Sequence, residues 1–238
     1  MSAGGGRSFV DLHVHTSASF DSLASPANVI RAAAARGLTH LAITDHDRVD
    51  GALAARALAA DIAPNLTILV GQEVKTRDGD LICVFLQQPI PTGLPATDAI
   101  AAAREQGALV GIPHPFDRFR GSSLETESLA GLAPLVDWVE VHNARIMVGR
   151  GNEQAALFAN EHGLPGVAVS DAHSAIEIGV AYVALDGDPS TPAGLLAALP
   201  DAELVTGRAT VFVRAVTPIA KLVQRFRGNG RNRPVVIR

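Results

Sequence analysis

The strongest constraint on the fold is an alternation along the chain between short apolar runs, many of them β-branched, and longer alanine-rich stretches. The short runs are typical of buried strands, and the alanine-rich stretches are typical of helices. Strands and helices that alternate in this way form βαβ units around a parallel sheet. The chain has 238 residues, of which 47% are hydrophobic, enough for one sizeable buried core. We therefore expect a single α/β domain, built as a closed barrel or an open sheet.

Local signals place most of the element boundaries. Ser25 and Pro26 supply an N-cap and a first-turn proline for a helix that Gly37 ends. A turn at residues 77–80 predicts a hairpin. Strands are expected at residues 9–12, 41–44, 67–72, 81–86, 108–112, 138–141 and 166–169, and helices at residues 26–36, 50–60 with Asp50 as the cap, 97–106 and 152–162.

Charge and composition exclude several classes of protein. With 20 basic and 24 acidic residues and a net charge of -4, the chain lacks the basic excess of a general nucleic-acid-binding protein, although a nucleotide substrate stays open. No apolar stretch reaches the roughly 18 to 20 residues that cross a bilayer, so no membrane partner is expected. The one cysteine and the absence of an apolar leader favour the cytoplasm. The sequence does not indicate an oligomeric state.

Nearly every residue that could bind a metal follows directly on the end of an expected strand, where parallel α/β folds keep their active sites. His13 and His15, two residues apart, point to the same side and can offer two imidazole nitrogens to one ion. Asp171 and His173 repeat this spacing with mixed ligands. The other strand-end candidates are Asp45, His46, Asp47, Glu73, His114, His142 and Asn143.

Each of these pieces also has an ordinary structural explanation. An isolated His-x-His pair is a weak signal, Glu73 could be an exposed carboxylate, and His114 between two prolines could be a core ring. Unrelated residues would scatter over both ends of the sheet, however, whereas these gather at one end. Imidazole and carboxylate ligands suit Zn, Mn or Fe(II), and metal-activated water needs no serine or cysteine nucleophile. Five of the eight histidines lie at this end: His13, His15, His46, His114 and His173.

The ordered set of motifs resembles the polymerase and histidinol phosphatase (PHP) family of metal-dependent phosphoesterases, over about residues 9–185. The resemblance implies a distorted seven-stranded (β/α) barrel of the TIM-like kind, with two or three divalent metal ions and no organic cofactor. We expect a disordered N-terminus at residues 1–8, a PHP-type domain at 9–215 and a basic C-terminal tail at 216–238, which is expected to be a solvated terminal helix with a flexible end. The motifs are Asp11-Leu12-His13-Val14-His15-Thr16, Thr44-Asp45-His46-Asp47, Gly71-Gln72-Glu73, Pro113-His114-Pro115 and Ser170-Asp171-Ala172-His173.

A set of metal ligands is also implied by the resemblance. Many members carry a further histidine on the strand after the glutamate, but this chain has Ile82-Cys83 there. Asp80, water or Cys83 could replace it, or the cluster could be smaller than three; we favour an inert Cys83 in the core. The first implied ion takes His13, His15, Glu73 and Asp171, a second takes Glu73 and His114, and a third takes Asp21, His46 and His173.

These features predict a metal-dependent hydrolase that cleaves a phosphate ester by attack of a metal-bridging hydroxide. The expected substrate is a small phosphorylated metabolite, a nucleotide or a short oligonucleotide. Arg145 is the first candidate for a phosphate clamp, and Arg118, Arg120 and Lys75 are weaker ones. Asn143 is expected to contact substrate or a metal ligand, and His142 to face the scaffold. The expected catalytic set is His13, His15, Glu73, Asp171 and His173.

Two other functions stay open at this point. A metal-dependent amidohydrolase also begins with His-x-His at the end of its first strand. Such enzymes typically need a bridging lysine or further strand-end histidines, whereas here Glu73 follows the third strand. A PHP-like domain kept as a non-catalytic binding module is the second alternative; the retention of most metal positions weakens it, but the missing histidine keeps it open. Metal binding coupled to melting would separate a working site from a relict one.

Overall fold

The computed structural model describes residues 6–117, 126–146, 149–209 and 211–230. For residues 126–127 and 211–216 it describes the backbone alone. The strands form one mixed sheet in the order β7-β6-β5-β4-β3-β2-β1-β8-β9. Their bounds are β1 (Arg7–Val14), β2 (His40–Ile43), β3 (Thr67–Lys75), β4 (Asp80–Val84), β5 (Leu109–Ile112), β6 (Trp138–Asn143), β7 (Gly166–Val169), β8 (Tyr182–Asp186) and β9 (Glu203–Val205).

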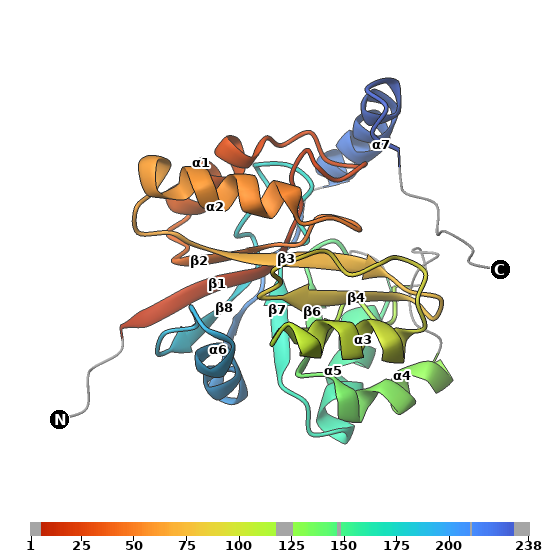
Figure 1. Cartoon of the computed structure of the whole chain (residues 1–238). Coiled ribbons are helices and arrows are strands. Elements are labelled where there is room, and N and C mark those ends of the chain that lie inside the picture. The colour runs from red at the N-terminus through yellow and green to blue at the C-terminus, as the bar shows by residue number, and fades with distance from the viewer. Residues whose placement is uncertain (1–5, 118–125, 147–148, 210, 231–238) are drawn as a thin grey trace.

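Strands β1 to β7 curl into a nearly closed barrel. Most neighbours are parallel, but β4 runs antiparallel to both β3 and β5. After β7, Ala172 forms a parallel bridge with Val14 at the end of β1, and the backbone N–H of His15 donates to the Ala172 carbonyl at 2.8 Å. This contact joins the seventh strand to the first (Figure 1). The expected distorted seven-stranded barrel is therefore confirmed, and β8 and β9 extend the sheet beside β1.

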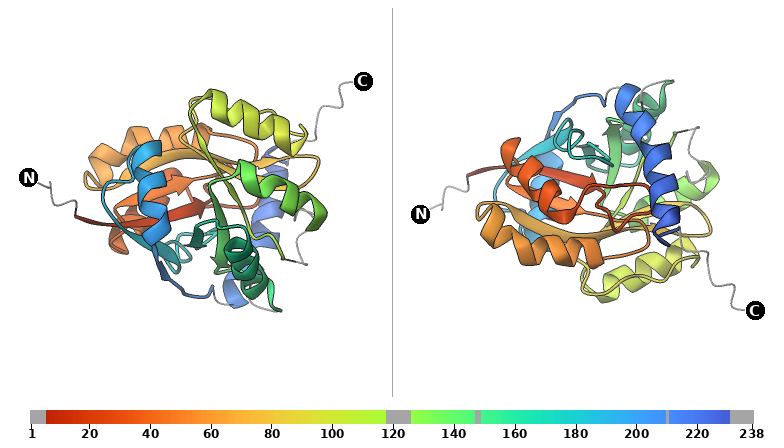
Figure 2. Two further views of the ribbon diagram at one scale, coloured as in Figure 1. Left: turned by 90° about the horizontal axis from the view of Figure 1, so that it is seen from below. Right: turned by 90° about the horizontal axis from the view of Figure 1, so that it is seen from above.

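Helices cover the outside of the barrel. Figure 2 shows α1 and α2 side by side against one part of the sheet, with α3, α4 and α5 against another. None of the described helices is long and apolar enough to cross a membrane. The helices are α1 (Pro26–Ala35), α2 (Asp50–Ile62), α3 (Ala96–Glu105), α4 (Thr126–Leu132), α5 (Gly151–Glu161), α6 (Pro192–Ala198) and α7 (Val211–Phe226), with 3₁₀ turns at Ala133–Leu135 and Leu199–Asp201.

Two apolar clusters separate the inside of the barrel from its outside. The inner cluster includes Val10, Leu12 and the Trp138 indole, and the outer cluster joins the other face of the strands to the helices. A Cβ atom on Gly111 would lie 2.1 Å from the Trp138 ring. Only glycine at this position therefore lets β5 and the indole approach so closely.

Three local expectations need correction. Arg7 and Ser8, expected in a disordered segment, belong to β1 because they pair with β8; residues 1–5 lie outside the described part. Asp50 is the first residue of α2 and not its cap, because both of its carboxylate oxygens accept hydrogen bonds from Arg48 at 2.7 Å. Helix α7 continues to residue 226, inside the basic segment where a solvated terminal helix and a flexible end were expected, but it is not wholly solvated. Its buried Gln224 donates to carbonyls of the loop after β1.

Candidate metal centre

A β-bulge in β1 aims the first two histidines. Val10 and Leu12 belong to the inner cluster, whereas Val14 belongs to the outer one. The change of side follows from a register shift against β2 between Asp11 and Val14, where one extra residue is inserted. The bulge puts His13, next to Leu12, at the mouth of the barrel. A regular strand would have turned it toward the helices.

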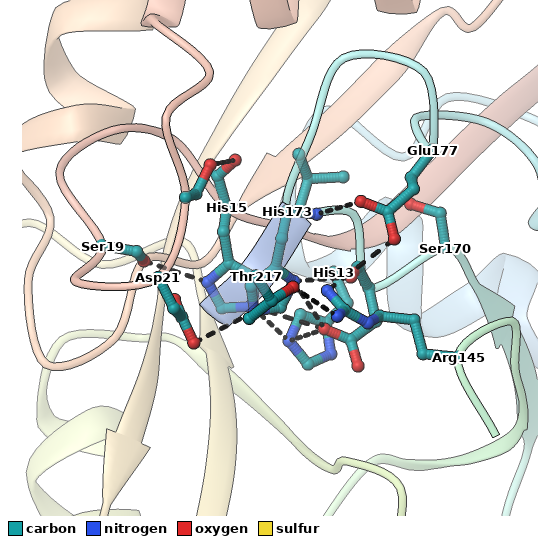
Figure 3. Close-up of polar contacts among 12 residues, drawn as sticks. His13, His15, Ser19, Asp21, Arg145, Ser170, His173, Glu177 and Thr217 are labelled. Carbon is teal, nitrogen blue, oxygen red and sulfur yellow. Dashed lines mark hydrogen bonds and ion pairs between the residues drawn. The ribbon is translucent and has the colours of Figure 1, made fainter. Parts of the chain in front are cut away.

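Eight side chains meet at this mouth, and each is at most 8% exposed. The Nε2 atoms of His13 and His15 lie 3.0 Å apart, and each is 3.6 Å from Oδ1 of Asp171. Figure 3 shows both rings directed toward one another beside His173. The structure therefore brings together all the ligands implied by the motifs: His13, His15, Asp21, His46, Glu73, His114, Asp171 and His173.

A second group of ligand atoms surrounds Asp21. Its Oδ2 atom lies 3.3 Å from Nε2 of His46 and 3.3 Å from Nε2 of His173. Glu73 stands between the groups, with Oε2 3.0 Å from Nδ1 of His46 and 3.4 Å from Nε2 of His13. Two sets have all their ligand atoms within 4.8 Å of one another: His15, Asp21, His46 and His173, and His13, His15 and Asp171.

His114 contributes less to the cluster. Its Nε2 atom is 3.1 Å from Oε1 of Glu73, and its Nδ1 atom has no hydrogen-bond partner among the described residues. Ile82 pairs directly with Glu73 and belongs to the inner cluster. Cys83 faces the outer cluster, and burial raises the pKa of its thiol to about 12. Asp80 lies on the same side of β4 as Ile82, toward the mouth, and is buried.

Hydrogen bonds on the far side of the rings determine which nitrogen faces the cluster. Nδ1 of His15 donates to Oγ of Ser19 at 3.1 Å, because that hydroxyl itself donates to Asp45 at 2.9 Å. Nδ1 of His173 donates to the carbonyl of Asp171 at 2.8 Å. Burial lowers the pKa of both rings, that of His173 to about 3. Both therefore present an unprotonated Nε2 atom to the cluster, the state that binds metal.

The electrostatics of the cluster favour bound positive charge. Burial acts to lower the pKa of His13, but the carboxylates of Glu140, Asp171 and Glu73 outweigh it and hold this pKa well above its usual range. Burial likewise acts to raise the pKa of Glu73, but His46 and His13 hold it well below its usual range. The carboxylate of Glu73 is thus ionised in a fully buried position.

Divalent metal ions fit this donor set. Oε2 of Glu73 and Oδ1 of Asp21 are buried and form no well-aligned hydrogen bond with any described residue, although Nδ1 of His46 lies 3.0 Å from Oε2. This state is costly for a carboxylate unless a cation binds it. Two imidazole nitrogens 3.0 Å apart also need a cation or a proton between them. Imidazole and carboxylate without thiolate suit Zn, Mn or Fe. We take these orphaned atoms as the structural evidence for a metal centre.

Arg145 lies beside the cluster and is 5% exposed. Its Nη2 atom donates to Oγ1 of Thr217 on α7 at 2.7 Å, and its Nη1 atom lies 3.7 Å from Oε1 of Glu177 (Figure 3). Glu177 in turn accepts the backbone N–H of His173 at 3.0 Å. Arg145, the expected phosphate-binding residue, is therefore linked to the metal-ligand candidate His173 through Glu177.

The remaining predicted residues have other positions. Asn143 is fully buried, and its amide donates to Glu140 and Asp171 at 3.0 Å each. His142 bonds the carbonyl of Gly207 at 2.8 Å and so faces the scaffold, as expected. Lys75 is the last residue of β3, and its backbone N–H donates to Oδ1 of Asp47 at 2.8 Å. Arg118 and Arg120 lie outside the described residues.

Two buried carboxylates that support the ligands, Glu140 and Glu177, were not predicted from the sequence, whereas Asp45 was expected only as a possible metal ligand. Glu140 accepts from His13 at 2.6 Å, and Asp45 binds the loop that carries Ser19. The two-residue period of β6 contained a signal for Glu140, because it follows Trp138 on the inner face. Glu177 had no such signal, since it lies in a loop after the last motif.

Comparison with known proteins identifies related chains. The profile of the PHP domain matches residues 11–164, and that of a PHP-associated region matches residues 149–204. An uncharacterized protein of Methanocaldococcus jannaschii is 32% identical over 178 residues, which cover 73% of this chain and 69% of that protein.

Among solved structures, a two-domain protein from Bacteroides vulgatus described as containing a predicted PHP-like metal-dependent phosphoesterase superimposes with a TM-score of 0.71 at 18% identity, over 86% of this chain and 66% of that one. The lesion-specific endonuclease of Pyrococcus furiosus gives a TM-score of 0.58 at 15% identity, over 84% of this chain and 58% of that one. At these identities the likeness is one of fold.

Proposed function

This chain belongs to the PHP family, and from that premise we propose that it is a metal-dependent phosphoesterase acting on a small phosphorylated metabolite, a nucleotide or a short oligonucleotide. The observation that carries the proposal is the joint position of the cluster and one guanidinium. Buried imidazole and carboxylate ligands lie at the mouth of the barrel, and Arg145 lies beside them with an Nη1 atom that makes no hydrogen bond to the described residues. A cationic site with an adjacent guanidinium suits a phosphate dianion.

The proposed ligands divide into two tight sets and one weaker position. His13, His15 and Asp171 form one set, and His15, Asp21, His46 and His173 form the other. Glu73 lies between them, and His114 extends the cluster on the far side of Glu73. Zn, Mn or Fe(II) bound there supplies Lewis-acid activation of water and neutralises charge on the phosphoryl oxygens.

Arg145 is the proposed phosphate-binding residue. The planar fork of its guanidinium matches phosphate geometry. Its Nη1 atom makes no hydrogen bond to the described residues, although Oε1 of Glu177 lies 3.7 Å away. A phosphoryl oxygen within hydrogen-bonding distance of Nη1 would be a better acceptor than Oε1 of Glu177 at 3.7 Å. Glu177 and Thr217 would thus hold the guanidinium ready on the side of the cluster where His173 lies.

The fold does not identify the leaving group of the substrate. The endonuclease of Pyrococcus furiosus acts on nucleic acid, and this likeness supports testing nucleotides beside sugar phosphates. The net charge of -4 disfavours a long polyanionic ligand held by a basic surface. A nucleotide or a short end of a strand is the largest nucleic-acid substrate that we propose.

The decisive assay uses protein stripped of metal and resupplied with Mn, Zn or Fe(II). We expect hydrolysis of p-nitrophenyl phosphate or of its bis-ester to return with at least one metal, and the preferred ester will separate monoesterase from diesterase. The His13→Ala, His15→Ala double variant is the control and should stay at background. Tight metal binding without turnover of either ester would contradict the proposal and favour amide substrates or a non-catalytic module.

A further inference from the structure

Glu140 is a buried carboxylate of β6 that touches three parts of the candidate metal centre. Its Oε1 atom lies 2.6 Å from Nδ1 of His13. Its Oε2 atom accepts the backbone N–H of His114 at 3.0 Å and the side-chain amide of Asn143 at 3.0 Å. The same amide of Asn143 donates to Oδ2 of Asp171 at 3.0 Å. One carboxylate thus connects ligands from three separate strand ends.

We propose that Glu140 is the positioning residue of the metal centre, which fixes the ring of His13, the backbone of His114 and, through Asn143, the carboxylate of Asp171. The inference rests on the proposed metal-binding function of those ligands. Glu140 itself is not a ligand, because both of its oxygens face hydrogen-bond donors. Its contribution is to present Nε2 of His13 and Oδ1 of Asp171 at the same place.

The shape of β6 shows why this residue reaches all three partners. Trp138 and Glu140 lie on the inner face, and a register shift against β7 falls between Glu140 and His142. Because of this bulge, Asn143 turns inward and His142 turns outward to bond Gly207. The bulge therefore places Glu140 and the amide of Asn143 together beneath the ligands.

The backbone at His114 and Asp171 needs such support. Both residues have positive φ angles, +30° and +51° respectively, a region that costs free energy for residues other than glycine. Oε2 of Glu140 holds the N–H of His114 directly, and Asn143 holds the side chain of Asp171. The network thus restrains both residues, by a hydrogen bond to the backbone of His114 and by one to the carboxylate of Asp171.

Glu140→Gln is a sharp test because glutamine cannot satisfy all three donors. A glutamine has one acceptor oxygen and one N–H₂ group. With its oxygen toward His114 and Asn143, its N–H₂ group faces Nδ1 of His13 and forces the proton of that ring onto Nε2. With the opposite orientation, its N–H₂ group meets two donors. Either arrangement disturbs a ligand without adding or removing bulk.

The experiment compares metal binding in wild type, Glu140→Gln and the control Asp137→Asn. Asp137 lies at the other end of β6, where it accepts the N–H of Val110 at 2.7 Å and pairs with Arg104. Metal-stripped protein is titrated with Co(II), and the visible absorption of the ion reports the ligands. Loss of a partner that orients a ligand typically costs about 10- to 100-fold in metal affinity. We expect that loss, with an altered spectrum, for Glu140→Gln only.

A folded Glu140→Gln protein with unchanged affinity and spectrum would overturn the inference. Should this variant fail to fold, ¹⁵N-edited NMR of the zinc-loaded wild type decides instead: a slowly exchanging proton on Nδ1 of His13 is expected, and an unprotonated Nδ1 would refute the role of Glu140. Neither measurement uses a substrate. A protein that binds metal in this way but hydrolyses no ester would contradict only the proposed function, whereas one that binds no metal would contradict both.

Discussion

The two sides of the candidate metal centre differ in how completely the chain supplies them. On the His15 side, formed by His13, His15, Asp21, His46, Asp171 and His173, two sets of ligand atoms lie within 4.8 Å of one another. On the His114 side, one imidazole faces a single oxygen of Glu73, and β4 places Ile82 opposite that glutamate. From this difference we expect the metal position on the His114 side to bind its ion more weakly than the positions on the His15 side.

The largest predicted difference is between a substitution on the His15 side and one on the His114 side. His15 belongs to both tight sets, so His15→Ala should lower turnover to background and remove tightly bound metal. His114→Ala should keep most of the metal, with a fall in kcat/KM of about 10- to 100-fold, the loss typical of a disturbed but occupied site. Bound ions per chain, counted by elemental analysis, and steady-state rates measure both. Equal losses in the two variants would contradict the division into sides.

Thermal melting gives the same contrast without a substrate. Ion at 100 times its Kd stabilises a native state that alone binds it by about 2.7 kcal/mol, which raises the Tm of a chain this size by roughly 5 to 10 °C. We expect that shift in wild type and most of it in His114→Ala. His15→Ala should melt at the same temperature with metal and with chelator, and a full shift in that variant would count against the proposed ligands.

Arg145 should affect substrate more than metal, because it lies beside the His15 side without being a ligand. Arg145→Lys loses the forked geometry, and one hydrogen bond to a charged group is typically worth about 1.5 to 3 kcal/mol. We therefore expect KM for a phosphate ester to rise roughly 10- to 100-fold, with the metal content unchanged. Arg150→Lys, at an exposed pair with Glu153, is the control. An unchanged KM would remove Arg145 from the proposed phosphate site.

Restoring an imidazole should strengthen the His114 side. Asp80 begins β4 on the same side as Ile82 and is buried near the mouth. Asp80→His should therefore tighten the most weakly held ion, by about tenfold if one good ligand contributes about 1.4 kcal/mol. Competition with a fluorescent chelator measures the change. No change in any metal affinity would show that β4 does not reach the cluster.

Cys83 should give the smallest effect. Its thiol faces the outer cluster, and a pKa of about 12 keeps it neutral at working pH. Cys83→Ser should therefore leave the metal content and the activity per folded chain unchanged, and iodoacetamide should not modify the native protein at pH 8. Loss of one bound ion in Cys83→Ser would instead indicate that the thiol is a metal ligand.

The same contrast appears between what the sequence could and could not predict. Residues that end strands were found because parallel strands bring their carboxyl ends to one edge, and all eight ligands meet there. The weakness expected of the His114 side, which rests on Ile82-Cys83 in place of the family's histidine, stays a prediction. Fold and family were thus predictable from order and spacing alone.

Features that depend on tertiary geometry were not predictable. The bulges near Asp11 and Glu140 change which face a side chain occupies, and no single-sequence pattern marks them. Gln224 bonds the carbonyl of Ser17, 207 residues away, so the docking of α7 left no local signal. Glu140 looked like an ordinary strand residue until its partners were known.

The most direct test of the account is anomalous diffraction from crystals of the Mn(II)-loaded protein. We predict two strong peaks, one at His13, His15 and Asp171 and one at Asp21, His46 and His173, with a weaker peak at most beside His114. A map without peaks at these residues, or with its strongest peak beside His114, would contradict the claim that the His15 side is the metal centre of this protein.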